Sequence, residues 1–226
     1  TPYYLKTPEK GSHLAWAESS AVIYANSIIG AWTNREGGPS ALAAAIIGKT
    51  PDYGVHQSKN RQPKILVKIE KSLQKEVEFG ALGIFLGTML KDKIPMIQGI
   101  KNAPKDWLKQ LGAALASTGM VSMFCMENSK IESSELETIS VESKDIIQTI
   151  EKLTTTSTTN PDLVFIGCPH CSLEEIQHIS KLIGEKKVKS GTKFWVCTSR
   201  YVKEKARKEV EKIERSGREA WIAMRY

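Results

Sequence analysis

The pattern of apolar and polar positions predicts alternating helices and strands along the chain. A helix rich in small residues is expected over 13–31. A second helix begins near Gly38-Pro39-Ser40, since proline is favoured at the first helical position, and ends at Gly48. Residues 64–71 alternate apolar and charged side chains, which indicates a half-buried strand. The following segments favour helix, strand, helix and strand in turn, over 78–90, 95–99, 104–118 and 120–126.

A polar stretch separates the two halves of the chain. Residues 127–160 are polar, with one helix expected near 144–153. Residues 154–160 form a Thr/Ser linker, because such a segment cannot bury apolar surface. After it, strand, helix, strand, helix and strand are expected over 163–166, 173–183, 194–197, 201–214 and 219–224. This order is typical of a parallel wound unit. We therefore predict an α/β protein with a helix-rich α/β region over 1–153 and a βαβαβ unit over 160–226.

Composition and charge narrow the function classes. Hydrophobic residues make up 41% and charged residues 25%, as in an ordinary globular protein. No apolar run approaches the roughly 18 residues that span a bilayer, and no signal segment opens the chain, so no membrane contact and a cytoplasmic location are expected. The net charge of +7 is concentrated in residues 181–218, with 13 Lys/Arg and 5 Asp/Glu. Pairs spaced four residues apart, such as Glu211 and Arg215, favour a solvated helix face over nucleic-acid binding.

Two of the four cysteines lie where a wound sheet carries its active site. Cys168 and Cys171 belong to Gly167-Cys168-Pro169-His170-Cys171, between a predicted strand and a predicted helix whose free N–H groups would stabilise a thiolate. Cys125 and Cys197 lie in apolar runs and are expected to be buried. On this evidence disulfide exchange, zinc binding, a single iron–sulfur ligand and a pair of cysteines without a role all remain open.

Polar residues interrupt the apolar segment near the amino terminus. Glu18, Ser19, Asn26 and Ser27 lie within the first expected helix, and buried polar side chains need partners, of which a polar ligand is one. Arg35 follows beside a glycine turn and the start of the second helix, a combination that can bind an anion. A capped turn with a surface arginine explains the same residues.

Several of these blocks resemble the aconitase X family. They are Gly11-Ser12-His13-Leu14-Ala15-Trp16-Ala17-Glu18-Ser19-Ser20-Ala21, Asn26-Ser27 through Thr33-Asn34-Arg35-Glu36-Gly37-Gly38, Tyr53-Gly54-Val55-His56 with Asn60-Arg61, and Gly167-Cys168-Pro169-His170. Their order and approximate spacing are those of the family. The resemblance implies an aconitase-superfamily-like fold, with layers of helices around mixed or parallel sheets.

The resemblance also implies a lyase that dehydrates a hydroxy acid. Family members use an iron–sulfur cluster held by three cysteines, with one iron acting as a Lewis acid on the leaving hydroxyl. We expect a 4Fe-4S cluster, with 2Fe-2S or mononuclear iron as alternatives. The family substrate is 5-phosphomevalonate in the archaeal branch, in the mevalonate pathway of isoprenoid biosynthesis, and cis-3-hydroxy-L-proline in another branch. The basic, Lys/Ile-rich composition favours the archaeal substrate.

The resemblance assigns roles residue by residue. Cys168 becomes the metal ligand, and His170 is a candidate catalytic residue. The expected substrate-binding residues are Glu18, Ser19, Asn26, Ser27, Arg35, His56 and Arg61. The other two cluster cysteines would lie just before Thr1 and shortly after Tyr226, so we expect a segment of a longer protein. A small swivelling subunit or domain is expected to complete the site and supply the base, with a phosphorylated or carboxylated small molecule as substrate.

Two departures and two rival functions accompany this assignment. Trp32 stands where the family commonly has arginine, and Cys171 is not a typical ligand position. The rivals are a thiol–disulfide oxidoreductase using Cys168 and Cys171, and a non-enzymatic scaffold that binds a partner. The dehydratase hypothesis expects Cys168 to point into a cleft shared with Glu18, Ser19 and Arg35.

Overall fold

A computed structural model describes residues 3, 7–127, 136–217 and 220–224 of the chain. It is an α/β protein, as expected, and it divides into two compact units, which are described separately. The larger unit spans Thr7–Thr155 and the smaller spans Thr156–Tyr226. Within the described residues, every helix is too short or too polar to cross a membrane.

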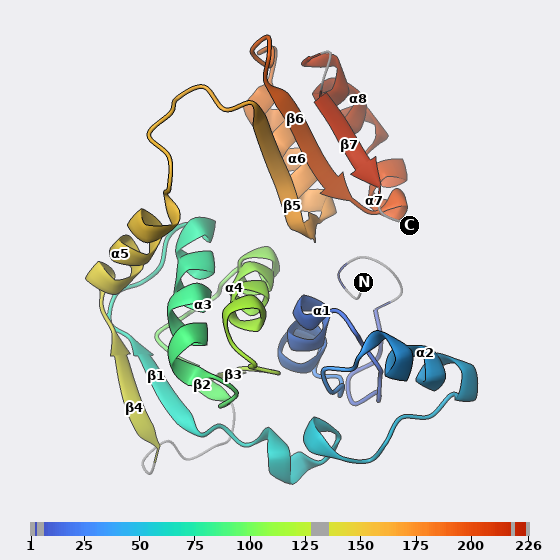
Figure 1. The fold of residues 1–226 in the computed structure, drawn as a ribbon, viewed down its shortest axis with the longest axis vertical. Helices are drawn as coiled ribbons and strands as arrows, with labels where there is room; N and C mark the ends of the chain where they lie inside the picture. The colour runs from blue at the N-terminus through green and yellow to red at the C-terminus, as the bar shows by residue number, and fades with distance from the viewer. Residues whose placement is uncertain (1–2, 4–6, 128–135, 218–219, 225–226) are drawn as a thin grey trace. The chain divides into compact units, whose positions relative to one another are not determined.

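A parallel sheet of four strands, in the order β3-β2-β1-β4, forms the base of the larger unit (Figure 1). The strands are β1 (Ile65–Ile69), β2 (Pro95–Gln98), β3 (Cys125–Met126) and β4 (Glu137–Val141). Strand β4 pairs along all five residues of β1 but was not predicted, because it is short and mostly exposed and lies in a segment that reads as polar. The strand expected over 120–126 is reduced to its last two residues.

Three helices cover the larger sheet: α3 (Glu76–Leu90), α4 (Lys105–Thr118) and α5 (Ser143–Leu153). Val67 of β1, Leu82 of α3 and Leu111 of α4 are fully buried in one apolar cluster, which holds these elements together. The bounds predicted for the three helices, 78–90, 104–118 and 144–153, are confirmed to within two residues at each end.

Glycines set the close contact between α3 and α4. A Cβ added to Gly83 would lie 2.5 Å from the Cβ of Ala114, and one added to Gly87 would collide with Thr118. At Gly80 the same position is open, with nothing within 4 Å. The face of α3 that packs against α4 therefore contains Gly83 and Gly87 but not Gly80.

The amino-terminal segment differs from the helix expected over 13–31. His13 and Trp16 form bridges with Trp32 and Arg35, and the N–H of Leu14 donates to the carbonyl of Trp32 at 2.8 Å. Helix α1 (Ser19–Tyr24) begins only after this pairing and continues as a π-helix, η1 (Ala25–Ile29). The expected helix was wrong over 13–18, where the chain pairs with the segment 32–36, and at Gly30 and Ala31, which follow η1.

The remaining part of the larger unit connects α1 to the sheet. Helix α2 (Gly38–Ile47) has proline near its start and ends at Gly48 in a left-handed conformation, as predicted. Two short 3₁₀ helices follow, η2 (Gly54–His56) and η3 (Ser58–Arg61). They bring His56 and Arg61 back toward the segment that precedes α2, as the contacts below show.

The smaller unit is the expected alternation of parallel strands and helices. Its sheet has the order β5-β6-β7, from β5 (Leu163–Cys171), β6 (Lys193–Thr198) and β7 (Ala220–Met224). Helix α6 (Leu173–Ile183) follows β5, and α7 (Arg200–Lys205) and α8 (Arg207–Arg215) follow β6. The single helix predicted over 201–214 is thus divided at Ala206. Ile176, Val196 and Ile213 are fully buried at the centre of this unit.

Candidate functional site

Arg61 connects η1 and the residues that follow it to η2. Its Nη1 donates to Asn26 Oδ1 and to the carbonyl of Val55, both at 3.2 Å. Its Nη2 donates to the carbonyls of Asn26 at 3.2 Å and Ala31 at 3.1 Å. The guanidinium also lies 4.4 Å from the centre of the Trp32 ring, which gives that tryptophan a stacking role. Burial lowers the pKa of Arg61, although nearby Cys125 acts in the opposite direction. Groups of the protein itself therefore accept most of the hydrogen bonds that the Arg61 guanidinium can donate.

Asn26 is also fully engaged by protein groups. Its Nδ2 donates to the carbonyls of Thr33 at 2.9 Å and Ser122 at 3.0 Å. Its Oδ1 accepts from the N–H of Thr33 at 2.9 Å, in addition to the guanidinium bond. A side-chain amide has two donors and two acceptor sites, so Asn26 has no remaining group for a ligand. Ser27 Oγ accepts from the N–H of Phe124 at 2.8 Å and so ties η1 to the segment before β3.

A charged cluster lies at the beginning of α1. Arg35 Nη2 donates to Ser19 Oγ at 2.9 Å, and its Nη1 donates to the carbonyl of Gly119 at 3.1 Å. The adjacent Ser20 hydroxyl donates to the carboxylate of Glu18, which is exposed. Arg35 and Ser19 are therefore in direct contact, and Glu18 precedes Ser19 in the chain, so that a carboxylate, two hydroxyls and a guanidinium lie at the start of α1.

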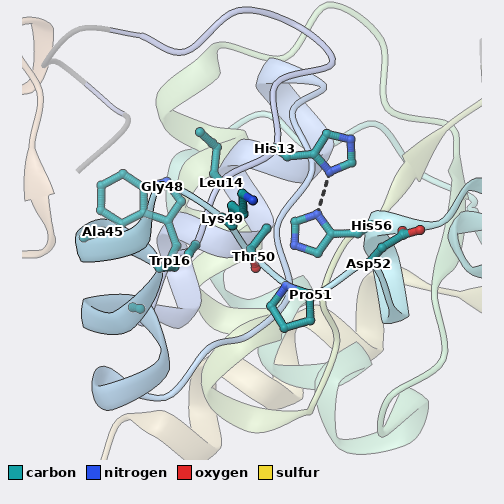
Figure 2. A pocket seen from close by; sticks show the side chains of 13 residues that line it. His13, Leu14, Trp16, Ala45, Gly48, Lys49, Thr50, Pro51, Asp52 and His56 are labelled. Carbon is teal, nitrogen blue, oxygen red and sulfur yellow. Dashed lines mark hydrogen bonds between the residues drawn. The ribbon is translucent and has the colours of Figure 1, made fainter.

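Two histidines form a pair at a pocket in the larger unit. His13 Nδ1 and His56 Nδ1 lie 2.8 Å apart, and their rings stack with centroids 5.0 Å apart (Figure 2). His56 is only 4% exposed, and its burial lowers its pKa. His13 lowers that pKa further, while the carboxylates of Glu36 and Asp52 partly raise it. A neutral His56 ring is therefore favoured at this position.

The pocket has a volume of about 900 Å³. One wall is apolar, from Leu14, Trp16 and the alanines of α2, and the other carries polar residues. The polar lining residues are His13, Lys49, Thr50, Asp52 and His56. Lys49 and Thr50 were not predicted, because a Gly-Lys-Thr-Pro sequence after a helix has no specific chemical signature.

Cys168 occupies a different setting from the one predicted. Strand β5 continues through the motif to Cys171, and the register against β6 shifts between Ile166 and Cys171. Helix α6 begins at Leu173, as predicted, and Ser172 caps it, since its Oγ accepts from the N–H of Glu175 at 3.1 Å. Cys168 therefore lies within β5, four residues before the residue that caps α6, and the expected stabilisation of its thiolate by the helix start stays a prediction.

The motif nevertheless exposes a thiol. Cys168 is exposed and free of disulfide, whereas Cys171 is buried and His170 is half-buried. Gly167 has φ 122°, and a Cβ there would lie 2.4 Å from the carbonyl oxygen of Cys197, so only glycine permits this approach to β6. Cys197 is buried, as expected.

Metal-binding groups are limited in the part of the chain that the structure describes. No three His, Cys, Asp or Glu side chains gather there in an arrangement that could hold a metal ion. Cys125 is half-buried, not fully buried as predicted. Cys168 belongs to the smaller unit and Glu18 to the larger, so the cleft expected between them stays a prediction.

Family models match the chain along most of its length. They describe the aconitase X first domain at residues 1–59, the second domain at 63–151 and the third domain at 161–221. The chain belongs to the aconitase X family. The resemblance seen in the sequence and the expected fold class are both confirmed.

Individual aconitase X relatives agree with this assignment. The phosphomevalonate dehydratase large subunit of Methanosarcina mazei is 42% identical over 96% of this chain and 55% of the relative. The cis-3-hydroxy-L-proline dehydratase of Pseudomonas aeruginosa is 28% identical over 89% of this chain and 37% of the relative. The crystal structure of Thermococcus kodakaraensis aconitase X in its holo-form is 38% identical, with a TM-score of 0.90 over 99% of this chain and 59% of that chain. The chain thus spans about half the length of the phosphomevalonate dehydratase large subunits.

Proposed function

We propose that this protein acts in an aconitase X dehydratase that removes water from 5-phosphomevalonate. Four phosphomevalonate dehydratase large subunits are 39–45% identical to it, whereas two cis-3-hydroxy-L-proline dehydratases are 28% identical. We therefore favour 5-phosphomevalonate as the substrate, with cis-3-hydroxy-L-proline as the alternative. The relatives' names also support a dehydratase over the rival disulfide-exchange and scaffold functions.

The charged cluster at the start of α1 carries this proposal. Arg35 supplies a positive charge for an anionic substrate group, and its bond to Ser19 holds the guanidinium in place. Glu18 offers an exposed carboxylate that accepts a hydrogen bond from a substrate hydroxyl, and Ser20 orients that carboxylate. Both groups fit a hydroxy acid, which carries a hydroxyl and an anion.

The other predicted substrate residues divide into two groups. Asn26, Ser27 and Arg61 hold η1 and its neighbours through the bonds described above, so we assign them a positioning role. His56 remains a substrate-binding candidate because it lines the pocket.

Cys168 fits the role of one thiolate ligand of an iron–sulfur cluster. Its thiol is exposed and unbridged, so that it can be deprotonated and bind iron. The residues that the structure describes do not supply a group of three ligands, so we propose that the other ligands lie outside them. Bound iron supplies Lewis-acid polarisation of the leaving hydroxyl. His170, two residues from Cys168, is proposed to orient groups around this site.

A small subunit is proposed as the partner. The phosphomevalonate dehydratase relatives are named large subunits, which implies a second chain in those enzymes. We propose that a corresponding small subunit contributes the base that removes the substrate proton.

An anaerobic assay of the full-length protein with its small subunit tests the proposal. Each candidate substrate is incubated separately, and the dehydrated product is measured by NMR and by the mass of one lost water. Conversion of 5-phosphomevalonate is expected. Conversion of cis-3-hydroxy-L-proline alone would support the alternative, and conversion of neither would contradict the dehydratase assignment.

A further inference from the structure

The pocket beside α2 contains two buried polar atoms that the protein does not satisfy. His56 Nε2 and Thr50 Oγ1 both lack a hydrogen-bond partner among the described residues, and both residues line this pocket. Buried polar groups in native proteins nearly always have a partner, so each such atom requires an explanation. Their occurrence in one cavity indicates that a ligand supplies the missing bonds.

His56 is held so that its second nitrogen faces the cavity. Its Nδ1 is engaged by His13 at 2.8 Å, and the stacked rings prevent it from turning freely. Figure 2 shows the second nitrogen of His56 on the side where Thr50 lies. When His13 donates to Nδ1 of His56, the hydrogen of a neutral His56 ring is on Nε2, which then donates into the cavity.

The lining chemistry defines the class of ligand. Lys49 adds a positive charge to the hydroxyl of Thr50 and the ring nitrogen of His56. In Figure 2 the Asp52 carboxylate lies beyond His56, away from Lys49 and Thr50. Lys49, Thr50 and His56 can donate to an oxyanion, while the apolar wall opposite suits a short hydrocarbon chain. The volume of about 900 Å³ accommodates a small organic molecule and is not limited to a single ion.

Main-chain pairing connects one pocket residue to the charged cluster of α1. Trp16 lines the pocket, and its main chain bridges to Arg35, which contacts Ser19. Trp16 is also only two residues before Glu18.

We propose that the pocket binds the oxyanion end of a small hydroxy acid or its phosphate ester. Lys49, Thr50 and His56 are its polar contacts, and His13 is the positioning residue for His56. This inference rests on the proposed function, because it takes the dehydratase substrate as the occupant. The oxyanion is a carboxylate or a phosphate, and the three ligands of the titration below distinguish between these two groups.

Calorimetric titration of the full-length protein tests the pocket directly. The ligands are 5-phosphomevalonate, mevalonate, which has only the carboxylate, and inorganic phosphate. Thr50→Val keeps the side-chain shape and removes the hydroxyl, and His56→Gln removes the ring. Each variant is expected to bind the preferred ligand about tenfold more weakly, as loss of one hydrogen bond to an anion predicts. Thr138→Val, on the exposed face of β4, is the matched control and should leave binding unchanged.

The positioning of His56 by His13 is tested separately, through the ¹⁵N chemical shifts of the His56 ring. In His13→Phe the ¹⁵N shifts of the His56 ring should change, and His13→Asn should partly restore ligand affinity because it again offers a hydrogen-bonding group. Unchanged His56 shifts in His13→Phe would overturn the positioning role.

Failure of this inference can be distinguished from failure of the proposed function. If the wild-type enzyme dehydrates 5-phosphomevalonate while Thr50→Val and His56→Gln bind it normally, the pocket inference is wrong and the function stands. If both variants lose binding but the assembled enzyme does not dehydrate this ligand, the pocket binds the oxyanion and the proposed function is wrong.

Discussion

His13 and His56 share a contact of 2.8 Å between their Nδ1 atoms, although they lie 43 residues apart in the chain. One of the two nitrogens must donate and the other accept, so this contact disfavours protonation of both rings together. His56 is the buried partner, and its pKa is lowered from 6.5 by that burial and then by His13.

The lowered pKa of His56 predicts a pH dependence of stability. Below pH 6.5 the unfolded chain takes up a proton at this residue more readily than the folded chain does. The free energy of unfolding should therefore fall as the pH drops through the interval between 6.5 and the lower folded pKa. Urea unfolding at pH 7.5 and pH 5.5 measures this loss. The loss should be smaller in His56→Gln, and an equal loss in wild type and variant would contradict the assignment. The solvent-exposed His178→Gln serves as control.

Two threonines should respond in opposite ways to the same substitution. Thr33 is fully buried, and its Oγ1 accepts from the N–H of Trp16 at 3.1 Å and donates to the carbonyl of Asn34 at 2.9 Å. Thr33→Val should lower the free energy of unfolding by about 1–3 kcal/mol, because it leaves the N–H and the carbonyl unpaired. Thr50→Val removes a hydroxyl without a partner and should be neutral or slightly stabilising. Equal destabilisation by both would show that Thr50 has a structural partner.

The contact between α3 and α4 provides a matched glycine pair. Gly83→Ala should destabilise the protein by about 1–3 kcal/mol, since its Cβ would lie 2.5 Å from Ala114 Cβ and 2.6 Å from the carbonyl oxygen of Leu111. Gly80→Ala, in open space on the same helix, should stabilise it by about 0.5–1 kcal/mol through the higher helix propensity of alanine. Chemical denaturation of the two variants checks both signs, and a stabilised Gly83→Ala would refute this helix contact.

Glu18→Gln tests the charged cluster of α1 in the assembled enzyme. Because the amide keeps the shape and removes the charge, kcat/KM for 5-phosphomevalonate should fall roughly 10- to 100-fold, the range expected when a hydrogen bond to a charged group is lost. Unfolding should change little, since Glu18 is exposed. Glu151→Gln, on the exposed surface of α5, is the control. Unchanged kinetics in Glu18→Gln would remove this carboxylate from the site.

The local pattern of residues along the chain was sufficient to predict the helices and strands whose apolar residues face a neighbouring layer. The alternation around Val67 predicts β1, and the three- and four-residue spacing of the glycines on either side of Leu82 indicates α3. It was insufficient where a distant main chain decides the conformation. Leu14 is extended because it pairs with Trp32, and Cys168 lies within a strand because β5 continues beside β6 after a register shift.

In the candidate site too, contacts between residues distant in the sequence could not be predicted from the local pattern. The family blocks indicate Arg35 and Arg61 as similar candidates, yet Arg61 is engaged by carbonyls and Trp32 whereas Arg35 lies with Ser19. The spacing of residues in the sequence does not reveal this difference, because two of the partners of Arg61, Ala31 and Asn26, are 30 and 35 residues away. The pairing of His13 with His56 was missed for the same reason.

The iron content of anaerobically purified, full-length enzyme tests the central role of Cys168 most directly. Cys168→Ala should lose iron, sulfide and the visible thiolate-to-iron absorbance, because the exposed thiol is the proposed ligand. Cys171→Ala, which alters the buried thiol of the same motif, should retain them. Full iron content and absorbance in Cys168→Ala would contradict the assignment.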